Sequence, residues 1–153
     1  MTNKSNRNAR KKIPLAQRRK ARQLVMQALY QWVMADAEPT KIAEQFHDQN
    51  EGKIDWEYFD EVFIEIPKCV QSLDEHLVPV LDRSPDALDP IEKSLLYLGT
   101  YELSRRVDVP YKVVINECIE LAKVFGATDS HKYVNGVLDK LAVELRPAEI
   151  AKK

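Results

Sequence analysis

The segment ATDSHKY brings together three residue types that carry out chemistry in enzymes, Asp129, Ser130 and His131. A hydrolase triad uses an acid, a base and a nucleophile, but it requires an order in space that adjacency in the sequence does not supply. Thr128 and Asp129 are also residue types that commonly cap the start of a helix. We therefore interpret this segment as a helix cap followed by a histidine at the surface.

The sequence contains no recognisable pattern of a metal site, a cofactor site or a phosphate-binding loop. Its three histidines are not paired with cysteine or carboxylate at the spacing of metal ligands. Its four glycines do not form a phosphate-binding loop. Cys69 and Cys118 are too few for a disulfide framework, and we interpret both as buried free thiols. We expect no enzymatic activity, no metal and no cofactor.

Charge is distributed unevenly along the chain. Residues 1–35 hold nine Lys and Arg and no acidic residue, although the 153-residue chain has a formal net charge of −1. The whole chain has 23 basic and 24 acidic residues, so residues 36–153 carry the remaining 14 basic and all 24 acidic ones. A basic segment on an acidic body indicates a polyanion at one end and a different partner elsewhere.

Composition places the chain among globular proteins, with 44% hydrophobic and 31% charged residues. No apolar run approaches the roughly 18–20 residues that a membrane span needs. The basic start is not followed by the apolar segment of a signal peptide. We expect a cytoplasmic protein without a membrane partner, with a disordered basic arm over 1–14, one domain over 15–147 and a C-terminal tail over 148–153.

The helix expected over residues 15–34 combines an apolar stripe with a cationic side. Its stripe consists of Ala21, Leu24, Val25, Ala28, Leu29, Trp32 and Val33. A helix advances about 100° per residue, so Arg19 and Tyr30 project within about 20° of each other, and Arg22 lies about 80° from Tyr30. Arg and Lys contact phosphates, and aromatic rings stack on unpaired RNA bases. The candidate RNA-binding residues here are Arg18, Arg19, Lys20, Arg22 and Tyr30. A solvated basic face with a half-buried Tyr30 is the alternative.

The rest of the chain also shows apolar residues at helical spacing. We expect helices over about residues 41–47, 54–66, 69–81 and 111–125, one that begins at Pro90 and ends before VDVP, and one capped by Thr128 or Asp129. Asp89 can cap the helix that begins at Pro90, and Glu92 completes a box-like pattern. The prediction is an all-α bundle of about seven helices with no sheet.

Two residues inside these helices need a physical reason. Pro67 should kink or end its helix near Ile66, because proline removes a backbone hydrogen bond and clashes with the preceding turn. Gly136 weakens a helix relative to alanine. We expect Gly136 to pack closely against another backbone, and the functional alternative is a surface where RNA or protein approaches the helix.

Three segments of the chain resemble the NusB family, the N-utilization substance B family of bacterial transcription antitermination proteins. They are RRKARQLVMQALYQW, DPIEKSLLYLGTYEL and VPYKVVINECIELAKVFGATDSHKYVNGVLDKL. The resemblance covers about Gln17 to Pro147 and is most specific in the last two segments. It implies a bundle of two three-helix subdomains with an added helix, and no catalysis.

The resemblance also implies partners. Members of the family bind the boxA element of nascent ribosomal RNA transcripts, most tightly together with the ribosomal protein NusE. The complex joins NusA and NusG on RNA polymerase and opposes Rho-dependent termination. The sequence does not decide whether the free protein is a monomer or a homodimer.

The family's functional positions can be carried over residue by residue. The arginine-rich RNA-binding segment matches Arg18, Arg19, Lys20 and Arg22, and Tyr30 matches a tyrosine near the RNA on the same helix. Asp129 and Tyr133 match positions of the GAxDSHKFVNG motif that contribute to the RNA surface, with Tyr133 in place of the usual Phe. Glu92 matches an acidic position that faces the ribosomal protein. Lys20 replaces an arginine, and lysine lacks the bidentate fork of arginine.

Two other functions are compatible with the sequence. A NusB-like domain also forms part of some ribosomal RNA cytosine methyltransferases, so the chain could serve as an accessory domain in such a system. A helical scaffold with a basic tail that binds any polyanion without sequence preference is the second alternative.

Overall fold

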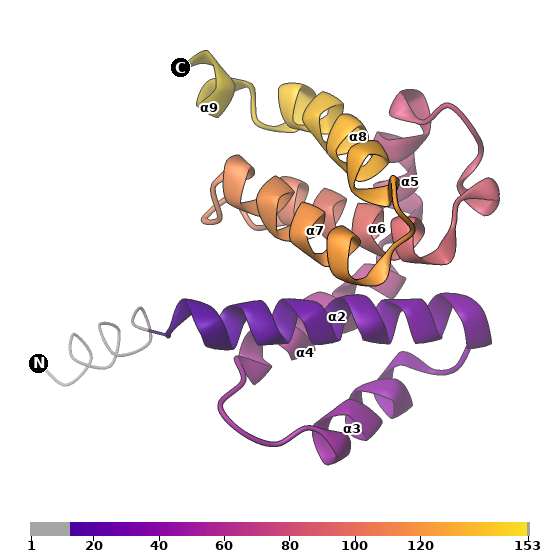
Figure 1. The fold of residues 1–153 in the computed structure, drawn as a ribbon, viewed down its shortest axis with the longest axis vertical. Coiled ribbons are helices and arrows are strands. Elements are labelled where there is room, and N and C mark those ends of the chain that lie inside the picture. The colour runs from indigo at the N-terminus through magenta and orange to yellow at the C-terminus, as the bar shows by residue number, and fades with distance from the viewer. Residues whose placement is uncertain (1–12, 153) are drawn as a thin grey trace, which may run out of the picture.

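The computed structural model describes residues 13–152, and every regular element in that range is helical (Figure 1). The α-helices are α2 (Leu15–Ala35), α3 (Pro39–Gln49), α4 (Trp56–Lys68), α5 (Val70–Leu77), α6 (Pro90–Arg105), α7 (Tyr111–Phe125), α8 (Ser130–Leu145) and α9 (Pro147–Ala151). Two 3-10 helices, η1 (Val78–Val80) and η2 (Pro85–Ala87), lie between α5 and α6. The predicted all-α class is confirmed, with one helix more than expected in the described range. The predicted basic arm falls outside the described residues except for Ile13 and Pro14.

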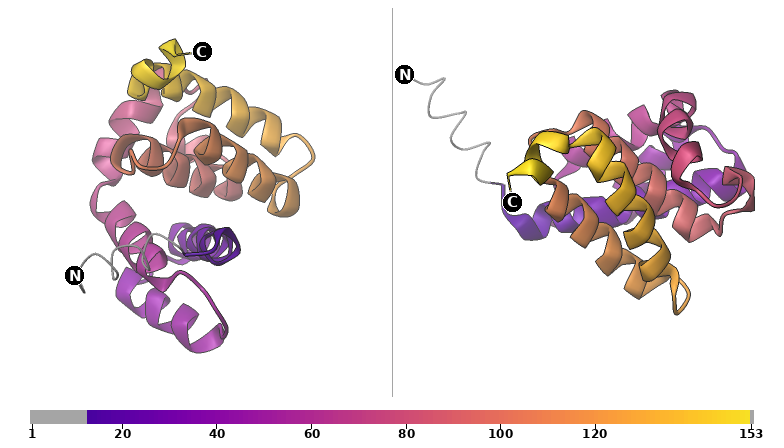
Figure 2. Two further views of the ribbon diagram at one scale, coloured as in Figure 1. Left: turned by 90° about the vertical axis from the view of Figure 1, so that its left-hand side faces the viewer. Right: turned by 90° about the horizontal axis from the view of Figure 1, so that it is seen from above.

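The helices form two groups of three (Figure 2). Helices α2, α3 and α4 contact one another, and α6, α7 and α8 form the second group. Helix α2 contacts both α4 and α6, so it lies at the boundary of the groups. Helix α5 follows α4 directly and packs on α6, and α9 packs against α8. This arrangement agrees with the two three-helix subdomains implied by the family resemblance.

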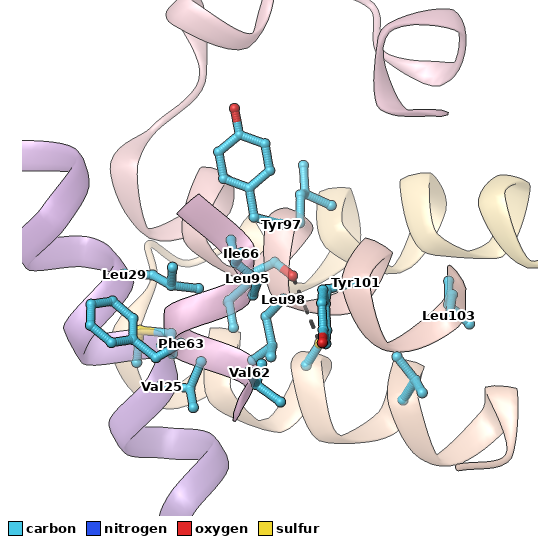
Figure 3. Close-up of a cluster of buried hydrophobic side chains, with 14 of the residues drawn as sticks. Val25, Leu29, Val62, Phe63, Ile66, Leu95, Tyr97, Leu98, Tyr101 and Leu103 are labelled. Carbon is cyan, nitrogen blue, oxygen red and sulfur yellow. Dashed lines mark hydrogen bonds between the residues drawn. The ribbon is translucent and has the colours of Figure 1, made fainter. Parts of the chain in front are cut away.

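Helix α6 forms the centre of the core because ten consecutive residues, from Ser94 to Leu103, are buried. Side chains of α4 and α2 meet it from one side (Figure 3). The central cluster includes Val25, Leu29, Val62, Phe63, Ile66, Leu95 and Leu98. A helix that is buried almost all round cannot fold alone, so both three-helix groups depend on α6.

The helix ends follow local sequence signals at several positions. Asp89 accepts hydrogen bonds from the backbone N–H groups of Ile91 (2.9 Å) and Glu92 (3.2 Å), which confirms the predicted cap of α6. Pro39 is the first residue of α3, which starts before the predicted Lys41, because a proline at this position has no N–H to leave unpaired. Helix α4 continues through Pro67 to Lys68, and α5 starts at Val70, so the predicted break occurs two residues late.

The C-terminal segment over 148–153, predicted as a tail, overlaps the short helix α9. Arg146, 5% exposed, donates to the backbone oxygens of Leu103 (2.7 Å), Glu102 (3.1 Å) and Arg106 (3.0 Å) at the end of α6. The last carbonyls of a helix lack partners within it, and Arg146 supplies one to Leu103, whereas the Glu102 and Arg106 oxygens also accept a backbone N–H. Glu149 pairs with Arg146 and accepts from the Tyr111 N–H (3.1 Å). These contacts hold α9 against the bundle.

Close packing between helices involves Gly99 and not Gly136. A Cβ atom at Gly99 would lie 2.7 Å from Cδ2 of Leu138, so α6 and α8 approach closely there. The equivalent position at Gly136 has no atom within 4 Å, and Gly136 is exposed. The expectation that Gly136 packs against another backbone was therefore wrong.

Substitution by alanine should have opposite effects on stability at Gly136 and Gly99. Gly136→Ala should raise the free energy of unfolding by about 0.5–1 kcal/mol, because alanine is the better helix former and nothing obstructs its methyl group. Gly99→Ala should lower the free energy of unfolding by about 1–3 kcal/mol, because the buried Leu138 side chain must move. Urea denaturation followed by circular dichroism measures both. A Gly136→Ala variant less stable than the wild type would contradict the open environment of this residue.

Candidate nucleic-acid interface

The cationic side of α2 separates into exposed and buried residues. Arg19 and Lys20 are exposed, and the Arg19 side chain retains 67% of its accessible surface. They line a groove of about 530 Å³ between α2 and α7, together with Gln23, Glu117 and Glu120. The Nε atom of Arg19 lies 3.0 Å from Oε2 of Glu117 on α7. An exposed pair of this kind is weak, so the Arg19 guanidinium can exchange this carboxylate for a phosphate.

Arg18 is anchored to the start of α4. Its Nε donates to Oδ2 of Asp55 over 2.7 Å, and the Asp55 side chain is only 2% exposed. The other Asp55 oxygen accepts from the Tyr58 N–H (3.1 Å) and so caps α4. The Arg18 guanidinium also lies 4.7 Å from the centre of the Tyr58 ring, within the range of a cation–π contact. Arg18 therefore keeps a charge near the surface in a nearly fixed position.

Arg22 does not reach the cationic surface on which the helical geometry placed it. Its side chain is 4% exposed, and its guanidinium binds Glu102 of α6 through two hydrogen bonds, of 2.8 Å and 3.1 Å. Glu102 is fully buried. A third contact of 3.4 Å reaches Glu117, the residue that also pairs with Arg19. Sequence reasoning missed the partner, although a glutamate within the apolar segment LLYLGTYEL signals a buried charge that needs a cation.

Tyr30 lies near the other end of α2, at the edge of an apolar groove. Its side chain is 37% exposed, and the groove of about 650 Å³ is also lined by Met34, Phe46, Ile91 and Phe125. Eleven residues of helix separate Arg19 from Tyr30, which corresponds to about 16 Å along the axis. The structure therefore places the cations and this ring on one helix, at two separate positions.

Asp129 holds the N-cap position of α8, and its side chain is available at the surface. It precedes the helix, but its side chain makes no capping hydrogen bond, contrary to our expectation. Instead, Ser130 Oγ accepts from the Ala127 N–H (3.1 Å) and donates to Oε2 of Glu92 (2.7 Å). The Asp129 side chain is 78% exposed and lies 3.5 Å from Nζ of Lys132. Glu92, predicted to face a protein partner, thereby joins α6 to α8 and is half-buried.

Tyr133 is partly exposed in the first turn of α8 and is covered by the segment before η2. Its hydroxyl donates to Oδ1 of Asp82 (3.0 Å), and the Arg83 guanidinium lies 4.7 Å from the ring centre. Burial and the hydrogen bond to Asp82 raise the pKa of this hydroxyl, so it stays protonated at neutral pH and acts as a donor. Sequence reasoning identified Tyr133 through the family resemblance but did not identify Asp82 or Arg83.

The end of α7 links Tyr30 on α2 with Asp129 before α8. Phe125, its last residue, lines the groove beside Tyr30, and Asp129 follows four residues later. Figure 1 shows the end of α7 close to the C-terminal half of α2, and the chain then turns away from α2 into α8. Arg18, Arg19 and Lys20 lie towards the opposite end of α2. The candidate surface thus extends along α2 and across the turn between α7 and α8.

The described residues offer neither a metal site nor a membrane span. Within residues 13–152, no three His, Cys, Asp or Glu side chains are grouped so that they could hold a metal ion. No helix in the same range is long and apolar enough to cross a bilayer. Cys118 is buried, and burial raises its pKa, which makes this thiol a poor nucleophile.

Comparisons with known proteins point to one family. The sequence model of the NusB family matches residues 19–143. A protein of Pseudomonas fluorescens Pf-5 named transcription antitermination protein NusB is 56% identical over 144 residues, which cover 94% of this chain and 87% of that protein. A NusB structure from T. maritima is 28% identical with a TM-score of 0.73, over 87% of this chain and 96% of that one. A structure of the antitermination factors NusB and NusE in complex with dsRNA supports the fold alone, at 23% identity, a TM-score of 0.76, and coverage of 84% and 97%.

The burial of Arg22 predicts a large stability effect. Arg22→Ala should lower the free energy of unfolding by about 3–5 kcal/mol, because it leaves Glu102 charged and unpaired in the core. Lys20→Ala, on the exposed side of the same helix, should change it by less than about 0.5 kcal/mol. Urea denaturation of both variants measures the difference.

A double variant tests why Arg22→Ala lowers the stability. In Arg22→Met/Glu102→Leu, apolar side chains replace both charges, so most of the lost stability should return. A double variant as unstable as Arg22→Ala would show that the unpaired carboxylate is not what destabilises the single variant.

Proposed function

Since this chain belongs to the NusB family, we propose that it is a transcription antitermination factor that binds RNA without catalysing a reaction. The observation that carries the proposal is the 56% identity to a transcription antitermination protein over 94% of the chain. That relative is matched over 87% of its own length, which favours this function over an accessory domain of a methyltransferase.

In detail, the protein binds the boxA element of nascent ribosomal RNA transcripts in the cytoplasm, together with the ribosomal protein NusE. The complex joins NusA and NusG on RNA polymerase and helps the polymerase to resist Rho-dependent termination. The free protein can form a homodimer. The charge distribution supports two different partners, because nine basic residues precede residue 36 and all 24 acidic residues follow residue 35.

The structure suggests distinct roles for the candidate residues. Arg19 and Lys20 are exposed and contact phosphates directly, and Arg18 adds a charge held in place by Asp55. Arg22 supports this surface from below, since it contacts Glu117, the partner of Arg19. The aromatic faces of Tyr30 and Tyr133 stack on unpaired bases, and single-stranded RNA is commonly recognised in this way.

The remaining candidate residues lie where RNA and protein partners would meet. Asp129 is 78% exposed, and its carboxylate can accept hydrogen bonds from base edges. Glu92 lies on the acidic body and faces NusE, a basic protein. Their connection through Ser130 brings the two proposed contact regions next to each other.

Removal of the exposed cations tests the RNA assignment. Arg19→Ala/Lys20→Ala should weaken binding to a boxA RNA, and the slope of log K against log salt should become shallower by about 1.4, since each lost phosphate contact contributes about 0.7. The matched control is Lys68→Ala/Arg105→Ala, which removes the same charge from exposed positions at the ends of α4 and α6. Fluorescence anisotropy across a salt series, with and without NusE, measures these effects.

The same titrations with a scrambled RNA test sequence preference. The wild type should prefer boxA, and NusE should increase this preference. If the Arg19→Ala/Lys20→Ala variant binds boxA RNA with the affinity and salt slope of the wild type, Arg19 and Lys20 do not contact phosphates. Equal binding of boxA and scrambled RNA, even with NusE present, would instead identify a nonspecific polyanion-binding scaffold.

A further inference from the structure

A cluster of three polar side chains lies outside the cationic helix that carries the proposed function. Arg83 binds the Asp82 carboxylate through Nε (2.7 Å) and Nη2 (3.0 Å), and the Tyr133 hydroxyl donates to the same carboxylate (3.0 Å). The Arg83 guanidinium lies 4.7 Å from the centre of the Tyr133 ring. Asp82 and Arg83 belong to the segment between η1 and η2, and Tyr133 belongs to α8. The cluster therefore depends on contacts between segments about 50 residues apart in sequence.

This cluster is joined by hydrogen bonds but open to solvent. The Asp82 and Arg83 side chains are 64% and 43% exposed. Hydrogen bonds from Arg83 and Tyr133 lower the pKa of Asp82 to about 2, so its carboxylate is charged at neutral pH. Exposed ion pairs contribute little to folding stability and are easily exchanged for other anions. The fold therefore does not need Arg83 to remain on Asp82.

The residue types match the chemistry of a nucleotide. An arginine guanidinium forms paired hydrogen bonds with phosphate oxygens, and its plane stacks on aromatic rings and bases. A tyrosine ring offers a face to a base. In the free protein, Arg83 occupies the space over the Tyr133 ring that a base would use.

The surface of α8 next to Tyr133 has a position without a side chain. Gly136 lies three residues further along α8, on a neighbouring part of the same face. It is exposed, and a Cβ atom there would meet nothing within 4 Å. No packing within the described residues accounts for a glycine at this helical position. The missing side chain leaves room for a ribose and its phosphate beside the ring.

We propose that Arg83 and Tyr133 form a binding site for one unpaired nucleotide of RNA, in which Arg83 leaves Asp82 to hold the phosphate and the base stacks on Tyr133. This inference rests on the proposed RNA-binding function and adds a residue to it. Asp82 has the opposite role, because its carboxylate competes with the phosphate for Arg83 and repels the RNA backbone.

Three substitutions test this site with boxA RNA in anisotropy titrations across a salt series. Arg83→Ala should weaken binding roughly fivefold to tenfold and make the salt slope shallower by about 0.7, the contribution of one phosphate. Arg83→Lys should retain the salt slope, because it keeps the charge. Asp82→Asn should tighten binding, because it removes the competing charge, and a folding defect would not produce that result.

Control measurements separate the loss of this site from a general loss of positive charge or of folded protein. Arg105→Ala removes one exposed cation at the end of α6 and should leave boxA affinity unchanged. Thermal unfolding followed by circular dichroism should give similar midpoints for all variants. Binding of purified NusE without RNA should be the same for Arg83→Ala and the wild type.

The outcomes distinguish this site from the proposed function. If the wild type prefers boxA but Arg83→Ala binds it with the wild-type affinity and slope, the nucleotide site is absent and the proposed function stands. Weaker binding of NusE without any change in RNA binding would overturn the site and assign Arg83 to the protein partner. A wild type that does not distinguish boxA from scrambled RNA would overturn both.

Discussion

The ion pair between Arg22 and Glu102 joins the two halves of this protein in its core. It connects α2, at the boundary of the two helix groups, with α6, the most buried helix, and both side chains are almost inaccessible to water. Two charges in an apolar interior are tolerated only when each satisfies the other. The position of α2 on α6 is therefore constrained by a requirement for two hydrogen bonds, in addition to apolar packing.

This constraint extends from the core to the candidate RNA surface. Arg22 also contacts Glu117, and Glu117 in turn binds the exposed Arg19. The Tyr58 ring lies within 5.5 Å of three guanidinium groups, those of Arg18, Arg22 and Arg106, which come from α2 and from the end of α6. Arg18 and Arg19 are thus connected through one or two side chains to the centre of the bundle. A surface held in this way loses less entropy when it binds a ligand.

The same helix serves two purposes because its sides differ. Leu24, Val25, Ala28 and Leu29 are buried against the rest of the bundle, while Arg19, Lys20 and Tyr30 are accessible. In the proposed function, RNA follows this accessible side and continues over the turn between α7 and α8. There the Ser130–Glu92 hydrogen bond connects the proposed RNA surface with the proposed position for the ribosomal protein. In the proposed function, these two contact regions form one adaptor surface built from α2, α6 and α8.

Local features of the sequence were sufficient for every α-helix of the described residues except α9, and for several of the helix ends. Asp89 and Pro90 predicted the start of α6, and apolar spacing predicted α2 and α7, because capping and periodicity involve residues within a few positions of each other. The family resemblance added Tyr133, Asp129 and Glu92 as candidate positions. Their roles, like those of the cations on α2, stay predictions.

Contacts between distant segments could not be read from the sequence. Arg22 and Glu102 are 80 residues apart, so the helical geometry of α2 alone assigned Arg22 to the surface. The glycine expected to lie between helices was Gly136, but the close approach occurs at Gly99, because the path of α6 past α8 depends on the whole bundle. The carboxylate and guanidinium over Tyr133 come from a segment about 50 residues earlier. Spacing along a chain specifies neighbours on one helix, whereas the partner of a buried charge or an aromatic face depends on how the helices pack.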